Sequence, residues 1–218
     1  MKRTVRNLLA VGVLALACSA NAATIGLYTF TTAETDKPTL ANASFSSFTR
    51  TGVSQSSATG VFQSSGYGAT GGNINLSQYV EFTITPSSGY QINLTQIPFD
   101  MFRSGNGNGT SAGSGPLNGQ ISVFNAGTLL QSQAFSPSDV SGNVVFNFTD
   151  FATQGQVSFR FYGWNAKDIT GTLALDNVQI DGGGVTPVPE PVNVALALFG
   201  ITAVGVGASR RFLARAKK

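Results

Sequence analysis

Apolar and polar residues alternate along much of the chain between residues 23 and 181, and this period of two restricts the fold more than any other feature. The segments 80–85 (VEFTIT) and 157–162 (VSFRFY) are typical. Successive side chains of a β-strand point to opposite faces, so such segments form strands with one buried face. No segment in this region carries an apolar stripe with the 3.6-residue period of a helix. We therefore expect an all-β protein.

The number and spacing of these segments predict two stacked antiparallel sheets. Turn sequences such as 87–89 (SSG) and 125–127 (NAG) separate the segments. The chain holds 16 phenylalanines, which should dominate the core. We predict a jelly-roll-like β-sandwich over residues 23–184, with about eight to ten short strands. The clearest strands are expected at residues 24–30, 44–50, 80–85, 121–124, 128–135, 144–149 and 157–162.

Two further strands change the phase of their alternation. In the first, apolar residues occupy even positions up to Leu94 and odd positions from Ile97. In the second, they occupy odd positions up to Leu175 and even positions from Val178. A one-residue slip turns a face outward, so each strand needs a bulge or a bend at the change.

Charge and composition exclude several classes of function. The chain has no histidine and one cysteine, which excludes an imidazole base, a Ser-His-Asp triad and a His-ligated zinc site. Between residues 23 and 189 there are five basic and nine acidic residues, so the body is acidic. A nucleic-acid partner is therefore not expected, because phosphate binding needs a basic face.

We expect no enzymatic activity from this body. The alternative is a hydrolase that uses two carboxylates across a cleft. Four aspartates are less obviously in turns, but their spacing singles out no pair. They are Asp100, Asp150, Asp168 and Asp176.

The N-terminal 22 residues have the pattern of a signal peptide. Three basic residues lie within the first six positions, an apolar run follows at 8–17, and Ala20 and Ala22 form an A-x-A cleavage site. The predicted partners are the Sec translocon and signal peptidase. Cleavage after Ala22 would remove Cys18, at which a lipoprotein modification is the alternative.

The segment 185–218 has the pattern of a membrane anchor. Gly182–Gly184 is expected to be a flexible break, and a proline-rich stretch then keeps the chain extended. Residues 192–209 carry no charge and are long enough for a short transmembrane helix. A basic tail, 210–218, follows and predicts that this end stays inside.

In this order, the motif Pro189-Glu190-Pro191, the apolar helix and the basic tail resemble the PEP-CTERM sorting signal of Gram-negative bacteria. The resemblance implies recognition of Pro189, Glu190 and Pro191 by an exosortase, a membrane peptidase, with Arg210 and Arg211 as the stop-transfer residues. It also implies removal of the helix and delivery of the body to the cell surface or extracellular matrix. The alternative is a permanent single-span anchor.

A weaker resemblance lies in the body. The segments 89–99, 103–104 and 171–178 resemble the framework of uncharacterised PEP-CTERM proteins, and the last also resembles jelly-roll carbohydrate-binding modules. Such modules imply exopolysaccharide as a ligand, for which we name Tyr162 and Trp164. They also imply Asp176 as a ligand of a structural calcium ion, with a role at a bulge as the alternative. No other cofactor is expected.

Overall fold

A computed structural model describes residues 22–31, 33–56, 58–68, 72–104, 113–189 and residue 199. The predicted signal peptide up to residue 21, and the predicted transmembrane segment and basic tail apart from Phe199, lie outside these residues. Among the residues described, no helix has the length and apolar character needed to cross a membrane.

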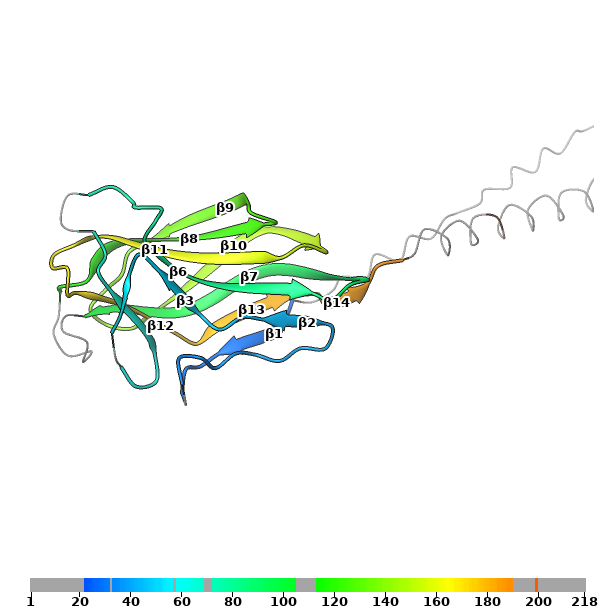
Figure 1. The fold of residues 1–218 in the computed structure, drawn as a ribbon, viewed down its shortest axis with the longest axis horizontal. Coiled ribbons are helices and arrows are strands. Elements are labelled where there is room, and N and C mark those ends of the chain that lie inside the picture. Colours follow the sequence, from blue (N-terminus) through cyan, green and yellow to red (C-terminus); the bar gives the residue numbers. More distant parts are fainter. Residues whose placement is uncertain are drawn as a thin grey trace, which may run out of the picture.

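The chain forms two antiparallel sheets packed face to face (Figure 1). The all-β sandwich predicted from the alternation is therefore confirmed. In the described part of the chain, sheet A has eight strands: β1 (Ala23–Tyr28), β4 (Ser54–Gln55), β5 (Phe62–Ser65), β7 (Tyr90–Ser104), β10 (Gly142–Thr153), β12 (Thr172–Asp176), β13 (Val178–Gly182) and β14 (Gly184–Pro187). Sheet B has six: β2 (Ala43–Phe45), β3 (Thr49–Thr51), β6 (Tyr79–Pro86), β8 (Pro116–Asn125), β9 (Thr128–Phe135) and β11 (Val157–Ala166).

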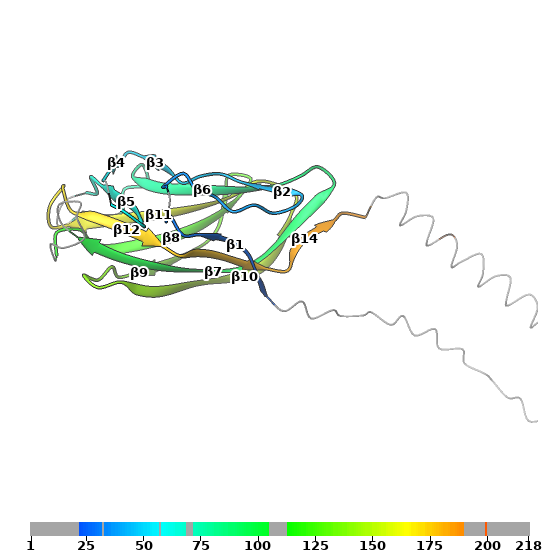
Figure 2. The same ribbon diagram turned by 90° about the horizontal axis from the view of Figure 1, so that it is seen from below.

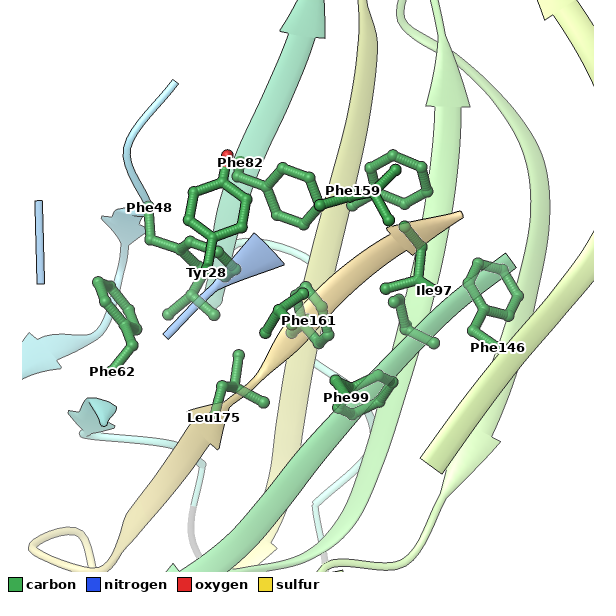
Figure 3. Close-up of a cluster of buried hydrophobic side chains, with 14 of the residues drawn as sticks. Tyr28, Phe48, Phe62, Phe82, Ile97, Phe99, Phe146, Phe159, Phe161 and Leu175 are labelled. Atoms are coloured by element: carbon green, nitrogen blue, oxygen red, sulfur yellow. The ribbon is translucent and has the colours of Figure 1, made fainter. Parts of the chain in front are cut away.

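Aromatic rings fill the space between the sheets, as the phenylalanine content predicted (Figure 3). Phe82 of β6 is fully buried within the cluster. Its ring centroid is 5.0 Å from that of Tyr28 on β1, 4.9 Å from that of Phe48 and 5.1 Å from that of Phe159 on β11. Tyr28 thus joins sheet A to sheet B through rings, and its hydroxyl donates a hydrogen bond to the carbonyl of Ser46 at 2.7 Å.

Both predicted phase changes coincide with irregular pairing. On β7 the change falls at Thr95–Gln96, and the register of the neighbouring strand β10 shifts there: Asn147 pairs with Gln96, but Phe151 pairs with Leu94. Strand β10 therefore bulges opposite the change. The second change falls at Asn177, which separates β12 from β13 and has φ of 47°. Asparagine tolerates this left-handed conformation better than most residues.

The open edge of β10 is covered by side chains of β9, the edge strand of the other sheet. Gln131 and Gln133 donate hydrogen bonds to the carbonyls of Asn147 and Val145, at 3.3 and 3.1 Å. Gln131 also accepts one from the amide of Thr149. An unpaired strand edge invites pairing with other chains, and these amides occupy it.

Of the three glycines expected to form a flexible break, Gly182 and Gly184 are instead part of sheet A, and Gly183 between them donates its amide to the carbonyl of Asn93 at 3.1 Å. Gly182 ends β13 in close contact with β7, where a Cβ atom would lie 1.9 Å from the carbonyl oxygen of Asn93. Strand β14 follows and pairs with the start of β7. The last bond runs from the amide of Val188 to the carbonyl of Gly89 at 2.9 Å. The sheet therefore continues past the boundary expected at residue 184.

The two ends of the described body lie together. Ala23 pairs with Gly182, and the start of β1 and strand β14 occupy the same end of the sandwich (Figure 2). We call this the terminal end. Strand β11 runs away from it, from Val157 to Trp164, so Trp164 lies toward the opposite end.

Replacing Phe82 with alanine should lower the free energy of unfolding by about 3–5 kcal/mol, because the cavity would lie among rings of both sheets. Leu129→Ala is the matched control, since Leu129 is 53% exposed. Urea unfolding followed by tyrosine and tryptophan fluorescence measures both. Equal losses in the two variants would show that the ring cluster does not hold the sheets together.

Candidate functional site

The outer face of sheet B carries a row of aligned polar and aromatic side chains. Cross-strand pairing places Arg160 of β11 between Glu81 of β6 and Ser122 of β8. The Arg160 guanidinium contacts the Glu81 carboxylate at 2.5 Å. It also lies 4.6 Å from the ring centre of Tyr79 and 4.5 Å from that of Phe124. The cation is thus neutralised by one neighbour and held flat between two rings.

Tyr162, one of the two predicted ligand residues, lies in the next row of this face but is covered. It is 2% exposed, and its ring centre is 5.6 Å from that of Tyr79. Burial raises the pKa of its hydroxyl. A ring this covered supports Tyr79 and Arg160 and offers little surface on which a sugar could stack.

Trp164, the other predicted ligand residue, is half-buried and lines a shallow pocket of about 150 Å³. Its strand partner Asn118 and the side chains of Phe135 and Ser136 complete one wall. The pocket depends on Gly119, because a Cβ atom there would lie 2.1 Å from the Phe135 ring. An aromatic ring beside an amide and a hydroxyl can hold a polar ring-shaped ligand by stacking and hydrogen bonding.

The sequence analysis named Trp164 but missed Asn118, Ser136 and the Arg160 pair. Asn118 and the Arg160 pair reach the face through pairing of β8 and β6 with β11, over separations of about 40 to 80 residues, whereas Ser136 follows β9, which pairs with β8. The alternation predicted that Glu81 and Arg160 point outward, whereas Asn118 and Ser136 lie outside the predicted strands. It could not show which of them are neighbours.

Asp176, the predicted calcium ligand, lies on the outer face of sheet A beside Asp100, its pairing partner on β7. Its carboxylate accepts a hydrogen bond from the amide of Asn177 at 2.7 Å, and the Asn177 side chain donates to Asp100 at 2.9 Å. Calcium takes six to eight oxygen ligands. The described residues contain no group of three or more acidic, histidine or cysteine side chains that could hold a metal. Asp176 lies at the break between β12 and β13, and its role as a calcium ligand stays a prediction.

The other aspartates considered for hydrolysis lie apart from this pair. Asp168 caps a turn, accepting bonds from the amide and hydroxyl of Thr170, both at 2.9 Å, and these bonds lower its pKa. Asp150 lies at the bulge of β10 and lines a groove on the outer face of sheet A.

The predicted sorting and cleavage residues lie at the edge of the described chain. Ala22 and Pro189 are both exposed, and the strands that adjoin them meet at the terminal end. Ala20, Glu190, Pro191, Arg210 and Arg211 lie outside the described residues.

No family model matches the chain, and no curated protein matches it. Among solved structures, it is similar to a family two carbohydrate esterase from Cellvibrio japonicus, with 11% identity, 68% of this chain and 36% of the other covered, and a TM-score of 0.33. A family 35 carbohydrate binding module from an environmental isolate has 14% identity, covers 66% and 91%, and has a TM-score of 0.31.

The CBM22-1 xylan-binding domain from Paenibacillus barcinonensis has 11% identity, covers 77% of this chain and 97% of the other, and has a TM-score of 0.40. The match to the esterase spans about a third of that enzyme's length. These likenesses are too loose to carry a functional argument.

Asp176→Asn should stabilise the protein slightly at neutral pH. Partial burial, and then the neighbouring Asp100, raise the pKa of Asp176. Because the pKa of Asp176 is higher in the folded than in the unfolded protein, the free energy of unfolding falls as the pH rises from the unfolded-state pKa through the folded-state pKa. Above this pH range, we expect Asp176→Asn to raise the free energy of unfolding by about a few tenths of a kcal/mol, after allowance for solvent screening. Below it, we expect no change. Urea unfolding at pH 3 and pH 7 measures it, and a loss of stability at pH 7 would contradict it.

Proposed function

We propose that this protein is an exported, non-catalytic protein that binds polysaccharide through the outer face of sheet B. The observation that carries the proposal is Trp164. Its ring is half-buried beside a pocket that also offers an amide and a hydroxyl, from Asn118 and Ser136. Stacking on a ring, together with a few placed polar groups, is a chemistry suited to sugars.

The charge of the face supports a ligand without strong charge. Arg160 is paired with Glu81 and covered by two rings, so it offers little net charge to a ligand. Serine and glutamine side chains, Ser122 and Gln120, continue the row and are hydrogen-bonded to each other at 3.1 Å. Such a face suits a neutral, hydroxyl-rich polymer better than an acidic one.

We also propose that the sandwich is a jelly roll. With β12 and β13 taken as one strand broken at Asn177, and with β2, β3, β4, β5 and β14 set aside, sheet A runs β1, β12/β13, β7, β10 and sheet B runs β6, β11, β8, β9. The chain therefore crosses repeatedly between the sheets. This topology supports an analogy to jelly-roll binding modules at the level of the fold, which by itself does not assign a ligand.

For delivery, we propose a cleaved signal peptide and exosortase sorting at Pro189-Glu190-Pro191, which would bring the body to the cell surface or the matrix. Ala22 and Pro189 both lie at the terminal end of the sandwich, which supports this route. Both processing sites would then face the membrane while the Trp164 pocket faces away from it. Permanent anchoring by residues 192–209 is the competing route.

Trp164→Ala should weaken binding to matrix polysaccharide by about tenfold or more, because the stacking surface is lost. Affinity electrophoresis in gels containing exopolysaccharide from the native host measures the change. Trp164→Phe should recover part of the affinity. Leu76→Ala is the control, since Leu76 is a large exposed apolar residue outside the pocket.

Unchanged migration of Trp164→Ala would refute the proposed site, provided that the variant melts at the wild-type temperature. Binding lost equally in Leu76→Ala would point to a general effect on the protein instead of a site at Trp164.

Sorting predicts a mature form that starts at Ala23 and ends near Pro189. Intact mass and C-terminal peptide mapping of the protein from envelope and medium fractions of the native host test this. A protein found only in membranes and still ending at Lys218 would contradict sorting and favour the permanent anchor.

A further inference from the structure

The bulge of β10 opens a groove on the outer face of sheet A, on the opposite side of the sandwich from the Trp164 pocket. The groove has a volume of about 670 Å³ and crosses β10, β7 and β14. On β10 the pairing skips from Asn147 to Phe151 while β7 advances only from Gln96 to Leu94. The extra residues include Asp150, which lines the groove.

The lining of the groove combines apolar surface, from Leu94, Phe151 and Ala152, with several polar groups and a single charge. It includes the amides of Gln91 and Asn93, the hydroxyls of Thr95 and Thr186, and one carboxylate, Asp150. Lysine and arginine are absent from this lining, so the groove does not suit an anion. One carboxylate does not make a divalent metal site. The remaining chemistry, acceptors and donors without strong charge, suits ligand hydroxyls.

Thr95 provides a second observation at the same place. Its hydroxyl oxygen is buried and has no hydrogen-bond partner among the described residues. Buried polar groups are nearly always paired, and an unpaired one is costly. The neighbouring Asn93 is satisfied differently: its amide donates to the Gly184 carbonyl and to the Thr186 hydroxyl, both at 3.4 Å. Thr95 therefore carries the hydroxyl of this lining that is left to be paired, and its side chain must rotate toward the groove to meet a ligand hydroxyl.

A smaller apolar pocket adjoins the groove on the other side of the bulge. It has a volume of about 250 Å³ and shares Asp150 and Phe151 with the groove. Val123, Leu130 and Phe148 form its apolar walls, and Leu130 is 47% exposed. A hydroxyl-binding groove thus lies directly beside a pocket for a small apolar group.

We propose that these two hollows together bind an O-acylated polysaccharide, with the sugar hydroxyls on Asn93, Thr95 and Asp150 and the acyl group between Leu130 and Phe148. This site shares no residue with the Trp164 pocket. Each site can therefore fail in experiment without the other, and the protein would be bivalent if both hold.

The experiment compares the purified full-length chain on acetylated xylan and on the same xylan after chemical deacetylation, by affinity electrophoresis. The wild type should bind the acetylated polymer about five- to tenfold more tightly. Thr95→Val keeps the shape and removes the hydroxyl, and Asp150→Asn removes the charge. Each should weaken binding to the acetylated polymer by about fivefold.

Thr24→Val is the matched control, because Thr24 is a threonine on β1 of the same sheet and lines none of the three hollows. It should leave binding unchanged. Trp164→Ala should keep the preference for the acetylated polymer even if it lowers total binding. Thermal melting confirms that each variant is folded.

Equal affinity of the wild type for the two polymers, or no binding to either, would overturn the proposal. So would wild-type binding by folded Thr95→Val and Asp150→Asn. Loss of the acetyl preference in Trp164→Ala alone would assign it to sheet B and also overturn it. If Trp164→Ala binds normally while Thr95→Val does not, the Trp164 proposal fails and this one stands.

Discussion

Sheet A is organised around a strand that cannot keep one face toward the core by regular pairing. Strand β7 carries buried side chains at even positions in its first half and at odd positions in its second half. The change is accommodated in its neighbours: β10 bulges on one side, and on the other side the chain passes from β13 to β14 at Gly182–Gly184. Because the neighbouring strands pair irregularly at this point, both halves of β7 place side chains in one aromatic core.

These irregularities also account for where polar groups collect on sheet A. The bulge exposes Asp150 and creates the groove beside Thr95. The break at Asn177 brings Asp100 and Asp176 together under the Asn177 amide. Sheet B is more regular, and on its outer face the side chains of paired residues line up across neighbouring strands. In one such row the Arg160 guanidinium lies between the rings of Tyr79 and Phe124. The two faces are therefore polar for different physical reasons.

Much of the fold follows from patterns within single strands. The alternation predicted the sandwich, its phenylalanine core and both phase changes, because burial of one face is a local constraint. The pairing of strands is not local. The neighbours of Trp164, the stacking of Arg160 and the covering of Tyr162 depend on register between remote segments. The prediction of a flexible break at Gly182 was also wrong. A glycine is needed there because β7 lies too close for a side chain.

The way the sheet ends at β14 has a consequence for a shortened chain. The last described pairing bond is donated by Val188, and the next residue is Pro189, which has no amide hydrogen to donate. The strand pairing of the described chain thus ends directly before the Pro189-Glu190-Pro191 motif. A chain cut after Pro189 keeps every sheet hydrogen bond of the described body. Its C-terminus then lies one residue beyond Val188, the last paired residue, so the cut leaves almost no unpaired segment for proteases to bind.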